Sequence, residues 1–273
     1  MNADRLVSVV IVGARGRMGK TLIRTVMESD NLTLVGAVDK SGSNDFGIDA
    51  GRLVGMPDCG VTVGDELRPP RGSVVVDFSL PDATDVNIAR CVEHGTPLVL
   101  GTTGISADTR GALQDAARQI PIVSAANFSA GVTLLTRLAA LAARSLGPEW
   151  NAELFEIHHR HKRDAPSGTA LRVAKAVASA TGRKLDDVAR FSRHDIDTPR
   201  TTEEIGIAAL RGGDSVGEHT LMFFGEGERL ELTHRATDRA IFARGALRAA
   251  HWVESRDPGL YDMADVLGLP ALG

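Results

Sequence analysis

The stretch LVSVVIVGARGRMG, Leu6 to Gly19, decides the fold of the first part of the chain. Its first half is a continuous run of mostly β-branched residues, the pattern of a strand buried on both faces. Its second half carries three glycines, and helical spacing of apolar residues then runs from Arg17 to Ser29. We therefore expect a buried strand, a tight glycine turn and a helix in direct succession.

The three glycines of this stretch, Gly13, Gly16 and Gly19, have the physical logic of a dinucleotide site. One glycine permits the turn, one lets the backbone approach a pyrophosphate, and one lets helix and strand pack closely. The spacing is GxxGxxG, one residue from the commoner GxGxxG, and a glycine triplet alone is equally compatible with a structural turn. The context favours a nicotinamide dinucleotide, because Asp39 ends the next predicted strand, where a carboxylate can bind the ribose hydroxyls.

Outward from this stretch, strand and helix patterns alternate as far as Ser129. Predicted strands start at Leu32, Ser73, Pro97 and Pro121, predicted helices start at Pro81 and Ala107, and residues 40–60 are predicted as a loop. Strands that alternate with helices predict an α/β fold with a parallel, doubly wound sheet.

A different rhythm begins after Ser129. A long apolar helix over 130–147 precedes a strand over 152–159 and a helix from Ser167 to Thr181, and residues 183–204 are predicted as a loop. Three closely spaced strands, 205–211, 218–224 and 229–236, are joined by glycine turns, which predicts hairpins. An apolar helix follows over 240–254. The pattern predicts a second, α+β domain.

Composition narrows the class of protein. The chain has 273 residues, enough for two unequal domains. A net charge of −4 gives no broad attraction to nucleic acid or anionic lipid, and no apolar run approaches transmembrane length. The cysteines, Cys59 and Cys91, match no metal or redox spacing and are typical of reduced thiols in a cytosolic protein. We therefore expect a cytoplasmic protein.

The charges around the glycine loop leave the choice of coenzyme open. Asp39 favours NADH, whereas Lys40 and Arg17 could neutralise the 2′-phosphate of NADPH or be solvated surface charges. The segments GTTG, Gly101 to Gly104, and AANFS, Ala125 to Ser129, end later strands, where ligands bind in open α/β sheets. Ordinary turns would explain these two segments equally well.

The stretch EIHHRHKRDAPSGTA, Glu156 to Ala170, concentrates nitrogen donors before a helix start. Structural zinc sites use four Cys or His ligands in paired spacings, which this bunched set does not offer, so no metal is expected. An anionic substrate fits better. Pro166 suits a first helical turn, Ser167 or Thr169 can cap it, and the exposed N–H groups can hold a carboxylate. Lys162 can donate a proton, and His158 or His159 can exchange one. A capped helix after a solvated basic loop is the alternative.

Taken in order, the motifs GARGRMG, DFS, GTTG, AANFS, EIHHRHKRDAPSGTA and GEHT resemble the dihydrodipicolinate reductase family over nearly the whole chain. The departures are mild: Arg15 occupies a variable place, and Asp39 stands where some relatives have Glu. The resemblance implies a Rossmann-like domain over 1–129, to which 239–273 return. It also implies an α+β domain with an open mixed sheet over 130–238, which binds substrate and joins four subunits into a homotetramer.

The same resemblance implies NADH- or NADPH-dependent reduction of 4-hydroxy-tetrahydrodipicolinate, with loss of water, in lysine and diaminopimelate biosynthesis. It assigns proton transfer to His158 and Lys162, and substrate binding to His159, Ser167, Gly168 and Thr169. The cofactor contacts that it implies are Gly13, Ala14, Arg15, Gly16, Arg17, Met18, Asp39, Lys40, Gly101, Thr102, Thr103, Ala125, Ala126, Asn127 and Phe128.

Two other functions remain compatible with the first half of the chain. A nicotinamide dehydrogenase for an amino or hydroxy acid would share that half but would not need the histidine stretch. A dinucleotide-sensing regulator would bind cofactor without turnover, although no DNA-reading helix supports it.

Overall fold

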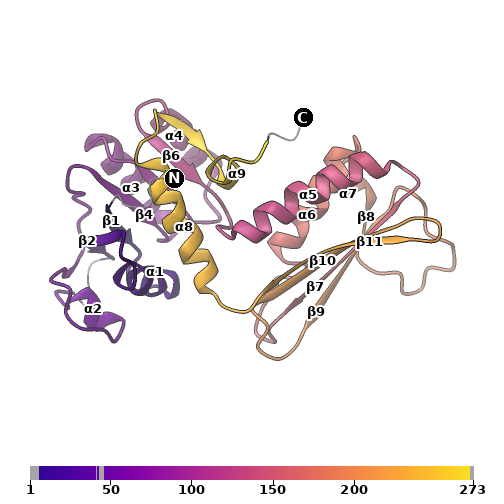
Figure 1. The fold of residues 1–273 in the computed structure, drawn as a ribbon, viewed down its shortest axis with the longest axis horizontal. Helices are drawn as coiled ribbons and strands as arrows, with labels where there is room; N and C mark the ends of the chain where they lie inside the picture. The colour runs from indigo at the N-terminus through magenta and orange to yellow at the C-terminus, as the bar shows by residue number, and fades with distance from the viewer. Residues whose placement is uncertain (1–5, 41, 43–45, 271–273) are drawn as a thin grey trace. The chain divides into compact units, whose positions relative to one another are not determined.

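The computed structural model describes residues 6–40, 42 and 46–270, and these form two compact units. Unit 1 comprises the described residues up to Ser129 together with Ala240–Gly268, and unit 2 comprises Ala130–Arg239 together with the described residues after Gly268. Within the described residues, no helix is both long and apolar enough to cross a membrane. Figure 1 shows the course of the chain.

Unit 1 is built on a seven-stranded sheet in the order β12-β6-β5-β4-β1-β2-β3, in which every pair of neighbours is parallel. Its strands are β1 (Val7–Val12), β2 (Leu32–Val38), β3 (Val63–Gly64), β4 (Ser73–Asp77), β5 (Leu98–Leu100), β6 (Pro121–Ser124) and β12 (Gly259–Tyr261). Its helices are α1 (Arg17–Met27), α2 (Ala50–Leu53), α3 (Pro81–Glu93), α4 (Ala107–Ala116), α8 (Ala240–Val253) and α9 (Met263–Leu267). The predicted doubly wound parallel sheet is confirmed.

The central strand β1 is buried on both faces, as its β-branched run predicts. Successive side chains of a strand point to opposite faces. Val9 and Ile11 accordingly belong to a core with α1 and α8, whereas Val10 and Val12 belong to a second core with α3 and α4. Strand order reverses between β1 and β4, the place where doubly wound sheets bind their ligands.

Unit 2 is a five-stranded mixed sheet in the order β11-β10-β7-β9-β8, with two long helices on one face. Its strands are β7 (Asn151–His158), β8 (Ala189–Arg190), β9 (Ile205–Arg211), β10 (Gly217–Phe224) and β11 (Arg229–Ala236), and its helices are α5 (Ala130–Leu146), α6 (Gly168–Ala180) and α7 (Leu185–Val188). Leu154, Ile207 and Leu221 form the core under α5 and α6. Figure 1 shows these two helices lying together along the sheet.

One predicted hairpin of unit 2 is wrong. β10 and β11 do form an antiparallel hairpin, but β9 does not pair with β10. Strand β7 lies between them, antiparallel to β10 and parallel to β9, which the chain reaches through α6. The glycine turn after β9 therefore spans two strand spacings, about 10 Å. β7 buries every second residue, from Ala152 to His158, as expected of a strand at the centre of a sheet that is covered on one face.

Two segments predicted as loops contain short elements. Residues 40–60 include α2, which Asp49 caps by accepting from the Gly51 N–H, and residues 183–204 include α7 and β8. These elements are only two to four residues long, so their sequences carry too few repeats for a period to show.

Candidate active site

The glycine loop after β1 is shaped so that only glycine fits at two of its positions. Gly13 has a φ of +80°, and a Cβ there would lie 2.7 Å from the carbonyl oxygen of Phe78. A Cβ at Gly19 would lie 2.1 Å from the carbonyl oxygen of Gly13. The missing side chains let α1 and β1 approach closely and leave the loop backbone open to a ligand.

The donors around this loop fit a dinucleotide. Helix α1 begins at Arg17, and no side chain among the described residues caps it at Gly16, so the N–H groups of its first turn remain as donors for an anion. Asp39 directly follows β2, and its Oδ2 accepts from the Arg15 N–H at 2.8 Å. Its Oδ1 accepts from the Lys40 N–H at 2.9 Å. The fold thus brings the predicted acid into contact with the predicted loop.

The segments after β4, β5 and β6 meet around the ring of Phe78. A Cβ at Gly101 would lie 2.3 Å from that ring, and the Phe128 ring lies 5.5 Å from it, centroid to centroid. Thr102 donates from Oγ1 to the Ser79 carbonyl at 3.2 Å. The Phe128 side chain is buried in the core of unit 1, whereas Thr103 is exposed. The predicted cofactor residues of GTTG and AANFS therefore lie on neighbouring loops at one edge of the sheet.

Asp77, the last residue of β4, is a buried carboxylate to which the sequence analysis gave no role. It accepts from Asn87 Nδ2 at 2.9 Å and from the Ser79 N–H at 2.7 Å, and Thr102 Oγ1 lies 3.4 Å from it. Asp77 therefore ties the loop after β4 to the loop after β5. An acid that ends an otherwise apolar, buried strand was the available signal.

The start of α6 is built as an anion-binding end. Ser167 is its N-cap, and the Ser167 Oγ accepts from the Ala170 N–H at 3.1 Å. Gly168 and Thr169 form the first turn, where N–H groups have no preceding helical carbonyl to bind. Pro166 lies before the cap rather than in the first turn, and Thr169 is not the cap, so the structure selects Ser167 from the two predicted caps.

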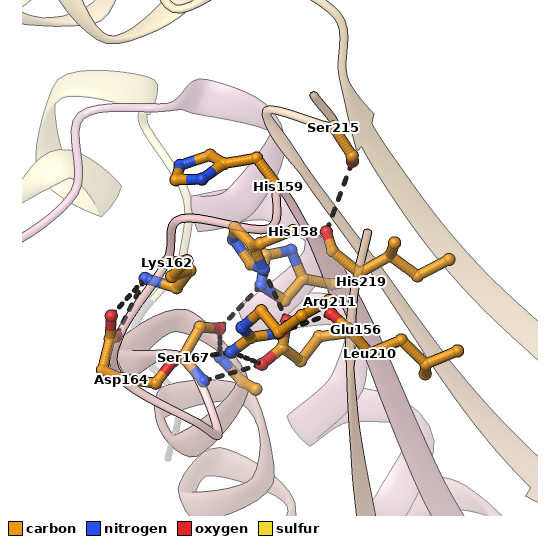
Figure 2. A network of polar contacts seen from close by, with 12 residues as sticks. Glu156, His158, His159, Lys162, Asp164, Ser167, Leu210, Arg211, Ser215 and His219 are labelled. Carbon is orange, nitrogen blue, oxygen red and sulfur yellow. Dashed lines mark hydrogen bonds and ion pairs between the residues drawn. The ribbon is translucent and has the colours of Figure 1, made fainter. Parts of the chain in front are cut away.

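His158, at the end of β7, is held by a buried carboxylate that the sequence analysis missed. The Oε2 of Glu156 lies 2.5 Å from Nδ1 of His158, and Arg211 of β9 donates to both oxygens of Glu156, at 2.8 and 2.7 Å. Figure 2 shows this network. Alternation along β7 places Glu156 and His158 on the same face, so the strand pattern contained a signal for it.

Charge and burial set the protonation of this pair. Burial alone would raise the pKa of Glu156, but the bonds from Arg211, His158 and the Ser167 N–H lower it below its usual value. Burial lowers the pKa of His158, the charges of Lys162 and Arg211 lower it further, and Glu156 partly offsets these effects. A charged Glu156 beside a neutral His158 is the resulting state at neutral pH.

The loop between β7 and α6 carries the other predicted polar residues. Lys162 donates from Nζ to both carboxylate oxygens of Asp164, each at 2.8 Å. Arg239 donates to Nε2 of His159 at 3.0 Å. Lys162, His159 and Ser167 are drawn around His158 in Figure 2. The structure therefore brings the predicted proton-transfer and substrate-binding residues together in unit 2.

A second buried histidine, His219 of β10, completes the cluster. Its ring packs edge-on against that of His158, with the centroids 5.2 Å apart, and its Nε2 lies 3.1 Å from the Ser167 Oγ. Burial lowers the pKa of His219 to about 4, and the neighbouring His158 adds to this effect. Among the described residues, no group of three or more His, Cys, Asp or Glu side chains is arranged to hold a metal ion.

Comparison with known proteins places this geometry in a family. Residues 7–128 match the family model for the N-terminus of dihydrodipicolinate reductase, and residues 131–267 match the model for its C-terminus. A 4-hydroxy-tetrahydrodipicolinate reductase of Alkalilimnicola ehrlichii is 50% identical over 96% of this chain and 98% of its own. The enzyme of that name from Anaeromyxobacter dehalogenans (strain 2CP-C) is 48% identical, with 97% and 98% covered.

A solved structure shows the same fold. The dipicolinate-bound dihydrodipicolinate reductase from Paenisporosarcina sp. TG-14 superposes with a TM-score of 0.76 at 24% identity, over 95% of this chain and 98% of that one. The resemblance drawn from the motifs is confirmed, because two family models and two relatives at about half identity agree along the sequence. With its glycine loop in one unit and its histidine cluster in the other, the chain belongs to the dihydrodipicolinate reductase family.

Proposed function

We propose that the chain is an NADH- or NADPH-dependent oxidoreductase that reduces 4-hydroxy-tetrahydrodipicolinate to tetrahydrodipicolinate, with loss of water. The relatives that carry this name match nearly the whole chain. The observation that carries the proposal is the cluster of unit 2, where His158 and Lys162 lie beside a helix start suited to carboxylates. This reaction belongs to lysine and diaminopimelate biosynthesis.

The dinucleotide is proposed to bind unit 1. The first-turn N–H groups of α1 receive the pyrophosphate, and Asp39 accepts hydrogen bonds from the ribose hydroxyls. Loops 101–103 and 125–128 line the nicotinamide end at the carboxyl edge of the sheet. When bound, the reduced nicotinamide supplies the hydride. Asp39 favours NADH, and Lys40 and Arg17 allow NADPH by neutralising a 2′-phosphate.

The substrate is proposed to bind unit 2 through its two carboxylates. The N–H groups of Gly168 and Thr169, together with the dipole of α6, receive one carboxylate, and His159 contacts a carboxylate as well. Ser167, whose hydroxyl caps α6, keeps this turn in place. A ring with two carboxylates suits this site because the site offers cationic and N–H donors.

Two side chains are proposed to move protons. Once hydride reaches the ring, the displaced electron pair moves toward the ring nitrogen and needs a proton. Lys162 supplies that proton, because an unperturbed lysine is protonated at neutral pH. A substrate carboxylate replaces Asp164 as the partner of Lys162 and keeps the ammonium near the ring. His158 exchanges a proton with the substrate ring or with solvent, since a neutral imidazole can accept and return one near pH 7.

The open face of the unit 2 sheet supports a homotetramer. The helices cover one face, while Phe155, Ala208 and Met222 lie on the other and are partly or largely exposed. Their cross-strand register brings Phe155 of β7 level with Ala208 of β9, so apolar side chains of two neighbouring strands adjoin on this face. Four such sheets packed together would bury these surfaces. Light scattering at micromolar concentration should give the tetramer mass, and a monomer mass would contradict the assembly.

The protein is further proposed to act in the cytoplasm, without nucleic acid or membrane partners. Both cysteines are free thiols, and Cys91 is fully buried with its pKa raised by burial, so it is inert.

Enzyme assay with freshly condensed substrate tests the proposal. Pyruvate and aspartate semialdehyde are condensed in place, and the absorbance of NADH or NADPH is followed with each coenzyme in turn. Coenzyme oxidation that depends on the condensate, and that dipicolinate inhibits, is the expected result. Oxidation that proceeds equally without the condensate, or none with either coenzyme, would refute the proposed function.

A further inference from the structure

Glu156 has contacts that exceed those of an ordinary ion pair. Its side chain is fully buried, and it accepts from three different parts of unit 2. Arg211 of β9 reaches both oxygens, His158 of β7 contacts Oε2, and the Ser167 N–H at the start of α6 donates to Oε1 at 2.9 Å. Figure 2 shows these contacts converging on one carboxylate.

The contact with His158 determines which ring nitrogen carries the proton. An ionised carboxylate only accepts hydrogen bonds, and the two bonds from Arg211 keep Glu156 ionised. Nδ1 of His158 must therefore be the protonated nitrogen, because it lies 2.5 Å from Oε2. In a neutral imidazole the other nitrogen, Nε2, then has the free electron pair.

Nε2 of His158 is placed to use that electron pair. It has no hydrogen-bond partner among the described residues. Some polar atoms, such as Nδ1 of His219, lack both a partner and solvent contact, but Nε2 of His158 does not belong to them. It therefore retains some accessible surface although His158 as a whole is only 8% exposed. A Cβ on Gly217 would lie 2.8 Å from Nε2, so glycine at that position keeps a side chain away from it.

The contact with Ser167 links the same carboxylate to the anion-binding turn. Oε1 holds the N–H of the residue that caps α6, so Glu156 fixes where that helix starts. The His158 ring and the Gly168–Thr169 turn thus share one anchor. A shift of this carboxylate would move the proton acceptor and the carboxylate donors together.

We propose that Glu156 is a positioning residue for the reduction: it holds His158 in the tautomer with the proton on Nδ1 and fixes the start of α6 against the substrate. This inference rests on the proposed function and adds a residue to it. Arg211 keeps Glu156 ionised. The groups that face His158 are Glu156 on β7, Arg211 on β9, His219 on β10, and Lys162 on the loop.

A purely structural role makes a different prediction. If Glu156 only satisfied Arg211 and stabilised unit 2, its replacement would lower stability but would leave the His158 tautomer unchanged. The positioning role requires the tautomer to change. Nitrogen-15 NMR of the histidine rings distinguishes protonated from unprotonated ring nitrogens, so it reads the role directly and needs no activity.

The test uses the whole enzyme and three variants. In the native enzyme, Nδ1 of His158 should be protonated and Nε2 bare at neutral pH. Glu156→Gln should give a mixture of tautomers, because an amide can donate as well as accept. Its His158 pKa should fall, since the carboxylate that raised it is gone. Its kcat should fall about 10²-fold. Glu156→Asp, which keeps the charge, should retain the native tautomer and recover part of kcat.

Glu204→Gln is the matched control. Glu204, like Glu156, is a carboxylate held by an arginine, here Arg193 at 2.6 Å, and its side chain is partly buried. It lies just before the start of β9, whereas Arg211, which holds Glu156, lies at the end of that strand. Glu204→Gln should leave kcat and the His158 tautomer as in the native enzyme.

Two results would overturn the positioning role. One is a native His158 with its proton on Nε2, which needs no variant and so is decisive even if Glu156→Gln does not fold. The other is a folded Glu156→Gln with native tautomer, pKa and kcat. A native enzyme that shows the expected tautomer but no reductase activity would instead refute the proposed function.

Discussion

Replacing Lys162 by alanine should abolish most turnover while leaving the fold and cofactor binding intact. The structure gives the stability side of this expectation. The only ion pair of Lys162 among the described residues is with Asp164, whose side chain is 60% exposed. Exposed pairs of this kind contribute about 0–1 kcal/mol, so the variant should lose no more than that. His158→Ala is less clean, because it also deprives the buried Glu156 of a donor.

The expected effect of Lys162→Ala on catalysis is larger than its effect on stability. Removing an acid–base group costs about 10²–10⁴-fold in rate, which corresponds to about 3–5 kcal/mol in the activation barrier. The rise in the activation barrier should therefore exceed any loss in the free energy of unfolding several-fold. Affinity for NADH should not change, because the glycine loop and Asp39 belong to the other unit.

Three measurements on one preparation decide this prediction: kcat with condensed substrate, NADH titration, and thermal unfolding. Lys175→Ala is the matched control, since Lys175 is an exposed lysine of α6 in the same unit. The control should behave as the native enzyme in all three. A Lys162→Ala variant with near-native kcat would remove Lys162 from the chemistry, and a kcat loss matched by an equal loss in Lys175→Ala would make the effect nonspecific.

Three further predictions follow from individual residues. Asp39→Ala should weaken NADH more than NADPH, by up to about 1.5–3 kcal/mol per lost charge-assisted bond; equal effects in coenzyme titrations would place Asp39 away from the ribose. Gly19→Ala should lower stability by about 1–3 kcal/mol, because its Cβ would overlap the Gly13 carbonyl; an unchanged unfolding temperature would refute the close packing. Acidification from pH 7 to 5 should cost about 2 kcal/mol through His219 alone, because its folded pKa of about 4 lies below the unfolded value, so the unfolded chain binds the proton first and stability falls as the pH drops. His219→Gln should flatten this pH dependence in calorimetry, and an equal slope in the variant would contradict it.

Unit 1 could be predicted well because its signals are local. The run from Val7 to Val12 is long, β-branched and bounded by glycine, and the chain alternates strand and helix at regular intervals. Connections between parallel strands are nearly always right-handed, which leaves few topologies. The proximity of the glycine loop to Asp39 could be predicted from their spacing alone, since the loop directly follows β1 and Asp39 directly follows its neighbour β2.

Unit 2 was harder because its decisive contacts are distant in sequence. β9 and β10 are neighbours in the chain and read as a hairpin, yet β7 lies between them. Arg211 and Glu156 are 55 residues apart and meet only through the parallel pairing of β7 with β9. No periodic pattern within a single segment of the sequence indicates that pairing. The histidines could be identified from composition and motif, whereas the carboxylate that orients one of them needed the sheet order.

Transfer of deuterium from the coenzyme to the product tests the proposed reaction most directly. NADH or NADPH carrying deuterium at the transferred position of the nicotinamide is incubated with the enzyme and freshly condensed substrate, and the product is analysed by mass spectrometry. Tetrahydrodipicolinate that carries a single deuterium, with one coenzyme oxidised per product, is the predicted result. Coenzyme oxidation without labelled tetrahydrodipicolinate would contradict it.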